Sequence, residues 1–194
     1  MQNLSSRQIQ IIDASIRIIS DGGIQDLTMK NLSGALGISE PAIYRHFRSK
    51  QEILMTMLES FKHRNRLIDK NTVAEGQSGL QHIREIVMSV FRKLMETPAV
   101  SAVIFSEEIF QNESELAEMI LEIQDANLRE FTGQIREGQM DGSIRKDIEA
   151  GELTIIIMGS IRHLVTNWRM SGFSFNLIDS GEKLLGSLEI LVGT

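Results

Sequence analysis

The 194-residue sequence contains no cysteine, only two prolines and 5% aromatic residues. Without cysteine the chain has no disulfide, no thiolate metal ligand and no cysteine nucleophile. No apolar run approaches the roughly 18 residues that a membrane span needs. The longest run, from Leu153 to Ile161, is interrupted by small and polar residues. The first residues also lack the basic and apolar segments of a secretory signal. A cytoplasmic protein without a membrane partner is therefore expected.

The composition that remains is typical of a folded protein with a real core, at 42% hydrophobic and 24% charged residues. The net charge of −6 is distributed unevenly along the chain. Residues 1–66 hold nine basic and six acidic residues, a net +3, whereas residues 67–194 hold eleven and twenty, a net −9. Only the first third is therefore suited to a phosphate backbone, although chance fluctuation in a short segment explains the same numbers.

Apolar residues recur at three- and four-residue spacing along most of the chain, and glycines stand at the expected helix edges. This periodicity predicts an all-α fold of about nine helices. The polar stretch 71–79 is the best domain boundary. The expected helices are 6–21, 29–36, 40–47, 49–66, 80–96, 98–110, 112–140, 147–171 and 179–192.

Residues 28–47 have the pattern of a helix-turn-helix, with two short helices on either side of a turn at Gly37. Ser33 is small enough for the second helix to cross closely over the first. Four apolar residues are expected between the helices: Leu32, Leu36, Ile38 and Ile43. An ordinary helical hairpin has the same pattern. The polar and basic residues expected on the outer side, however, favour contact with a phosphate backbone.

A longer motif makes this assignment specific. Its residues are Gly23-Ile24, Leu27-Thr28-Met29-Lys30, Leu36-Gly37-Ile38-Ser39, Ala42-Ile43-Tyr44-Arg45-His46-Phe47, Lys50 and Leu54. Residues 6–60 thereby resemble the DNA-binding domain of the tetracycline-repressor (TetR) family of bacterial transcriptional regulators, because Tyr-x-His-Phe and the following lysine add to the generic motif. The remainder resembles the family only in length, helicity and segment order.

The resemblance implies three parts: a helix-turn-helix DNA-binding domain over 1–48, a connecting helix over 49–70, and a helical effector-binding and dimerisation domain over 71–194. It further implies a homodimer that binds a palindromic DNA operator and releases it when a small molecule binds. A DNA-binding protein of the same fold without a small-molecule effector, regulated by a partner or architectural, is the alternative. Activation in place of repression also stays open.

Nine residues match the positions that contact DNA in the family. They are Thr28, Lys30, Glu40, Pro41, Ala42, Tyr44, Arg45, His46 and Lys50. The guanidinium of Arg45 can donate two hydrogen bonds to one guanine, and the ammonium of Lys50 can bind a phosphate. Glu40 contacts a cytosine amino group or simply complements the helix dipole.

The last two helices carry more apolar residues than one helix face holds. A two-fold four-helix bundle, with two helices from each subunit, explains this excess and is the family's usual interface. Burial within one subunit is the alternative.

A pocket for an apolar or amphipathic effector is expected within the second domain, although the same residues also suit a plain core. The candidate lining is Phe91, Met95, Phe110, Gln124, Asn127, Phe131, Ile161, His163, Asn167 and Trp168.

No chemical motif in the sequence points to an enzyme. There is no glycine-rich phosphate loop, no nucleophile elbow and no zinc motif around the four histidines. We therefore expect no catalytic residue, no metal and no cofactor.

Overall fold

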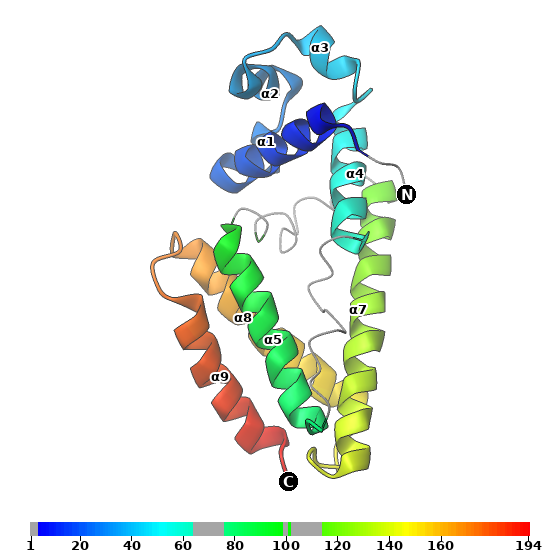
Figure 1. Ribbon diagram of the computed structural model, residues 1–194, viewed down its shortest axis with the longest axis vertical. Helices are drawn as coiled ribbons and strands as arrows, with labels where there is room; N and C mark the ends of the chain where they lie inside the picture. Colours follow the sequence, from blue (N-terminus) through cyan, green and yellow to red (C-terminus); the bar gives the residue numbers. More distant parts are fainter. Residues whose placement is uncertain (1–3, 64–75, 99–100, 102–113) are drawn as a thin grey trace. The chain divides into compact units, whose positions relative to one another are not determined.

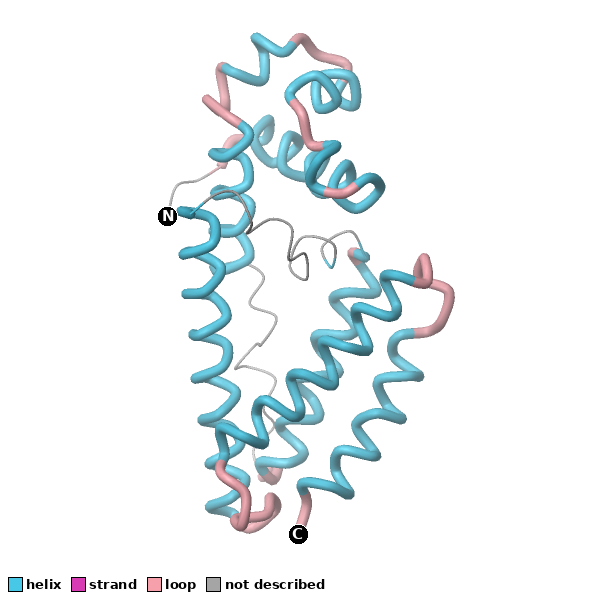
Figure 2. Tube along the Cα trace, turned by 180° about the vertical axis from the view of Figure 1, so that it is seen from behind, coloured by secondary structure: helices cyan, strands magenta, loops and turns pink. Residues whose placement is uncertain are grey.

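The computed structural model describes residues 4–63, 76–98, 101 and 114–194, and side chains are described outside 61–63. These residues form eight α-helices and one 3-10 helix joined by loops (Figures 1 and 2). The elements are α1 (Ser6–Gly22), η1 (Ile24–Asp26), α2 (Met29–Leu36), α3 (Glu40–Tyr44), α4 (Lys50–His63), α5 (Gly79–Glu96), α7 (Ser114–Asp141), α8 (Ala150–Met170) and α9 (Leu177–Val192). The predicted all-α fold is confirmed, while most of the helix expected over 98–110 lies outside the described residues.

The chain divides into two compact units. The first comprises Met1–Asn65 and Thr97–Leu121, and the second comprises Arg66–Glu96 and Glu122–Thr194. Helix α7 therefore contributes its first turns to one unit and the rest to the other. The boundary expected between residues 70 and 71 lies outside the described residues.

In the first unit, helix α1 begins with a reciprocal capping box. The Ser5 side chain accepts a hydrogen bond from the backbone N–H of Gln8, whose side chain accepts one from the Ser5 backbone. Gly23 follows the helix with φ 82°. This position favours glycine, because other residues rarely adopt such a backbone conformation. The predicted start and end of this helix are confirmed.

Helix α1 packs against η1, α2 and α4, and α2 packs against α3. A compact apolar core results, in which the following side chains are at most 5% exposed: Ile11, Ile12, Ile19, Leu27, Leu32, Ile43, Phe47, Ile53, Leu54, Met57 and Leu58. This core fixes the orientation of α3, a helix too short to be stable alone.

In the second unit, α9 packs against both α5 and α8 (Figure 1). Close approach of α9 and α5 depends on Gly181. A methyl group added there would lie 2.4 Å from the ring of Phe91, which is itself fully buried. Gly181 thus permits close packing of α9 on α5 within the chain.

The start of α5 is joined to the end of α7. The backbones of Gly79 and Gly138 touch, since a methyl group on Gly79 would lie 2.3 Å from the Gly138 Cα atom. The Gly79 N–H donates to Asp141 Oδ2 at 2.6 Å, and the Ser143 N–H donates to Asp141 Oδ1 at 2.8 Å. Hydrogen bonding by the Ser143 side chain and by these two N–H groups lowers the pKa of Asp141.

The last two helices begin at residues other than those predicted. Helix α8 begins at Ala150, because the carboxylate of Asp147 is held by the Arg145 guanidinium through two bonds of 2.7 Å. Helix α9 begins at Leu177, where the Asn176 side chain accepts hydrogen bonds from the N–H groups of Ile178 and Asp179. None of the helices in the described ranges combines the length and apolar character needed to cross a membrane.

Candidate nucleic-acid interface and exposed helix face

The turn between α2 and α3 is built by local hydrogen bonds. The Thr28 side chain caps α2 by accepting from the Asn31 N–H at 3.0 Å, and the Asn31 side chain donates to the Asp26 carbonyl at 2.8 Å. Gly37 ends α2 with φ 64°, the left-handed conformation that the predicted turn requires. The two short helices are therefore positioned by their own sequence as well as by the core.

Helix α3 is held in place by Ile43 and Phe47, which are 0% and 1% exposed. The neighbouring side chains of Tyr44 and Arg45 are exposed to solvent, and Tyr44 is 49% exposed. None of the nine predicted DNA-contacting residues is fully buried. All nine lie within the first unit, between the start of α2 and the start of α4.

Lys50 has a partner inside the protein. Its Nζ atom donates to the Ile24 carbonyl oxygen at 2.8 Å, joining the start of α4 to η1. This bond gives Lys50 a structural role besides the phosphate contact that the sequence predicts. That role was not foreseen, because it depends on a contact 26 residues away along the chain.

Two exposed residues near α3 were not among the predicted contacts. Ser39 precedes α3, but its side chain makes no capping hydrogen bond. Arg48 lies between His46 and Lys50 and is exposed. Its position between two predicted phosphate contacts is the signal by which Arg48 could have been found.

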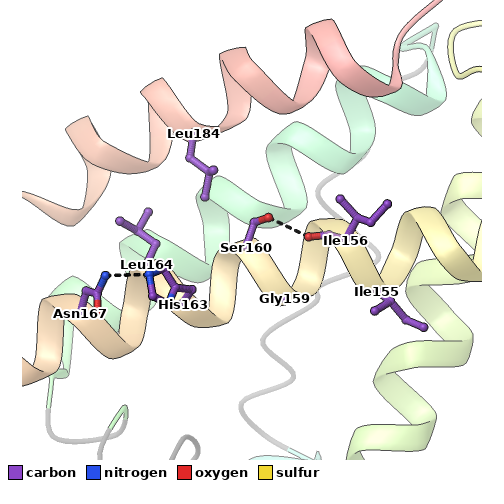
Figure 3. Close-up of a pocket in the computed structure, with 8 residues that line it drawn as sticks. All are labelled: Ile155, Ile156, Gly159, Ser160, His163, Leu164, Asn167 and Leu184. Atoms are coloured by element: carbon purple, nitrogen blue, oxygen red, sulfur yellow. Dashed lines mark hydrogen bonds between the residues drawn. The ribbon is translucent and has the colours of Figure 1, made fainter.

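The second unit has large apolar side chains exposed on α8 and α9, among them Ile155, Ile156, Ile190 and Leu191, and they define the exposed face of these two helices. A shallow hollow of about 640 Å³ lies on this face, lined by Ile155, Ile156, Gly159, Ser160, His163, Leu164, Asn167 and Leu184. Leu184 is the one lining residue from α9 and points toward α8 (Figure 3). The polar side chains that line the hollow have partners on α8 itself: Asn167 Nδ2 lies 3.0 Å from His163 Nε2, and Ser160 Oγ donates to the Ile156 carbonyl at 2.8 Å.

The ten predicted effector contacts do not share one cavity in the described residues. His163 and Asn167 line the exposed hollow. The others have these positions: Phe91, Phe131 and Trp168 are buried, Asn127 and Ile161 are half-buried, Met95 and Gln124 are exposed, and Phe110 is outside the described residues. Periodicity did not separate the inner and outer faces of α8, which is apolar on both.

A helix-turn-helix whose second helix is anchored by buried residues and is followed directly by exposed polar and basic ones defines a DNA-binding protein. Residues 11–57 match the family profile described as bacterial regulatory proteins, tetR family. Residues 61–191 match the profile described as YsiA-like protein, C-terminal region. The chain therefore belongs to the TetR family. It is a transcriptional regulator of the ligand-responsive repressor type.

Relatives of known name are similar over nearly the whole chain. The fatty acid metabolism regulator protein of Bacillus subtilis (strain 168) is 24% identical over 195 residues, covering 99% of this chain and 97% of the relative. The structure of the fatty acid degradation regulator FadR from Bacillus halodurans matches with a TM-score of 0.83 at 21% identity, covering 97% of both chains. FadR from Bacillus subtilis in complex with stearoyl-CoA matches with a TM-score of 0.78 at 23% identity, covering 93% of this chain and 96% of that one.

Proposed function

We propose that the protein is a cytoplasmic homodimeric repressor that binds a palindromic operator and is released from it by a fatty acyl thioester. The exposed surface around α3 is the observation that carries the DNA-binding part. In this proposal the domain boundaries remain those of the sequence, with DNA binding in 1–48, a connecting helix in 49–70 and effector binding and dimerisation in 71–194.

Contacts to DNA are assigned by chemistry. Arg45 reads a base edge in the major groove, because it is exposed directly after the short helix α3, at a position that Ile43 and Phe47 anchor. Pro41 and Ala42 contact thymine methyl groups, and Glu40 lies at the start of the same helix. The remaining predicted residues hold phosphates: Thr28, Lys30, Tyr44, His46 and Lys50.

The second copy of the chain covers the exposed face of α8 and α9. Ile155, Ile156, Ile190 and Leu191 are 64%, 47%, 85% and 58% exposed, and so many exposed large apolar side chains on two adjacent helices favour association. A methyl group added at Gly159 or Gly186 would meet no other described part of the chain within 4 Å, so helices from another molecule have room to approach. Two-fold symmetry then places the same residues on both sides of the interface.

The proposed effector class is a long acyl chain joined to coenzyme A. The relative from Bacillus subtilis is named for fatty acid metabolism, and a similar FadR structure holds stearoyl-CoA. An apolar or amphipathic molecule also suits the apolar composition of α5, where Phe91 and Met95 are among the predicted contacts. The similarity to named relatives favours the acyl thioester over other apolar effectors.

Operator release by an acyl thioester tests this proposal. A palindromic DNA site would be selected from a random library with the purified protein, and its affinity measured by fluorescence anisotropy. Stearoyl-CoA should weaken binding about 5- to 150-fold, the usual range of coupling between two sites. Free coenzyme A is the control.

Two results would count against the proposal in different ways. Failure to select any DNA site contradicts the assignment of the operator. Tight DNA binding that no acyl thioester changes favours the alternative of a DNA-binding protein regulated without a small molecule.

A further inference from the structure

The indole group of Trp168 is buried and has no hydrogen-bond partner among the described residues. The side chain is 2% exposed, at the end of α8, and its Nε1 atom meets no acceptor in this part of the chain. A buried N–H group that has lost its water costs free energy unless another acceptor replaces the water. An isolated unpaired donor in a native protein therefore needs an explanation.

The turn that follows Trp168 has a second unfavourable feature. Phe173 has φ 61°, a left-handed conformation that is unusual for an aromatic residue. Its N–H donates to the Trp168 carbonyl at 2.9 Å, and the two rings meet edge to face with centroids 4.7 Å apart. The strained residue is thus in direct contact with the unpaired indole.

Backbone strain and unpaired polar groups tend to be retained at binding sites, where a ligand compensates for them. A buried water is a weaker explanation, because it needs about two to four polar partners, and the aromatic ring packed on Trp168 offers none. Two other buried atoms of the same unit also lack a partner, His82 Nε2 on α5 and Gln134 Oε1 on α7. The unit therefore has unpaired polar atoms on three of its helices.

We propose that the indole N–H of Trp168 donates a hydrogen bond to an acceptor oxygen of the effector. This inference rests on the proposed function, and it adds which group of the protein pairs with an oxygen of the effector. That oxygen, such as a carbonyl or carboxylate oxygen, reaches the end of α8. The exposed turn at Ser171–Ser174 follows directly and packs its Phe173 ring against Trp168.

The single tryptophan of the chain makes a direct test possible, because the full protein has only one indole N–H resonance. Nitrogen-15 NMR spectra would be recorded without ligand, with stearoyl-CoA and with stearate, while calorimetry reports binding separately. In the ligand-free protein the indole proton should have the upfield shift of an unbonded donor. The bound ligand should move it downfield.

Calorimetry distinguishes failure of this inference from failure of the proposed function. If stearate binds and moves the resonance but stearoyl-CoA does not bind, the thioester class is wrong and the role of Trp168 stands. A resonance that is already downfield without ligand overturns the inference. So does one that no ligand moves.

A variant without the donor provides a second measurement. Replacing the tryptophan with β-(3-benzothienyl)alanine keeps the shape of the ring and removes the N–H, so folding is preserved. Trp168→Phe serves as the genetically encoded counterpart. Affinity for the ligand that moves the resonance should fall about five- to ten-fold, the size of one lost hydrogen bond. Without ligand, the benzothienyl variant should unfold at no lower temperature than the unaltered protein, because it loses no hydrogen bond. Unchanged affinity overturns the inference.

Discussion

At the scale of single residues, Arg45 and Lys50 have different surroundings although both were predicted to contact DNA. Arg45 is exposed, and its side chain makes no described contact with the rest of the protein. Lys50 is half-buried and donates to the Ile24 carbonyl. The first is free to read a base, whereas the second also holds the domain together. Their substitutions should therefore have different effects.

Arg45→Ala should relax the sequence preference and leave stability unchanged. Loss of a two-pronged contact to guanine removes about 1–3 kcal/mol of discrimination at one base pair.

Lys50→Ala should weaken binding to every sequence, reduce the slope of affinity against salt by about one, and lower the melting temperature. Titrations of the selected operator and of point-mutated operators at several salt concentrations measure both effects.

Arg17→Ala is the matched control, since Arg17 is exposed on α1 and was not predicted to contact DNA. Its affinity and salt slope should equal those of the unaltered protein. Unaltered discrimination in Arg45→Ala would remove that residue from the base-reading role.

At the scale of the elements, the sequence predicts what local chemistry decides. Ser5 and Gly37 mark helix ends because their hydrogen bond and backbone conformation depend on the nearest neighbours. The start of α8 depends on an ion pair within the preceding turn. The spacing of apolar residues does not predict this ion pair between Arg145 and Asp147.

The candidate effector site shows the limit of the same approach. Ile155 and Ile156 are exposed, whereas Ile157 is 1% exposed, although the three are consecutive and chemically identical. Only packing against other helices tells them apart. Periodicity predicts a helix and its composition, but it does not assign the faces of a helix that is apolar all round.

The junction of α5 and α7 should depend on pH through Asp141. Its pKa is lowered in the folded protein, so the carboxylate stabilises the fold above the ordinary value of 3.8. This contribution should be lost as the pH falls below that value toward the folded pKa. Unfolding by urea should therefore show Asp141→Asn less stable than the unaltered protein at pH 6, with the difference shrinking between pH 4 and pH 2.

Asp125→Asn is the comparison for this effect, because Asp125 is exposed on the same helix and makes no hydrogen bond in the described part of the chain. Its stability difference should be small at every pH. A stability difference for Asp141→Asn that stays constant from pH 6 to pH 2 would show that the carboxylate charge is not what stabilises the junction.

At the scale of the whole molecule, the charge distribution agrees with the assigned family. The net −6 includes a net +3 over residues 1–66, which contain the helix-turn-helix. So small a positive charge gives weak non-specific attraction to DNA. We therefore expect tight binding to require two DNA-binding domains acting together, about 34–36 Å apart along the DNA. Dimerisation and DNA affinity should be closely linked.

Substitution on the exposed face of α8 and α9 tests this link. Ile155→Glu combined with Ile190→Glu should convert the dimer to a monomer, because a charge buried at an apolar interface is strongly unfavourable. The fold should survive, since both side chains are exposed in the single chain, at 64% and 85%. Light scattering after gel filtration measures the mass, and circular dichroism checks the helices.

The control must be an equally exposed apolar residue elsewhere. Met140→Glu meets this condition, with Met140 75% exposed at the end of α7, and it should remain dimeric. The double variant should bind the full palindrome no more tightly than a half-site, because each monomer then binds independently. A double variant that stays dimeric would exclude this face as the interface. A monomer that keeps full affinity for the palindrome would instead show that one DNA-binding domain is sufficient.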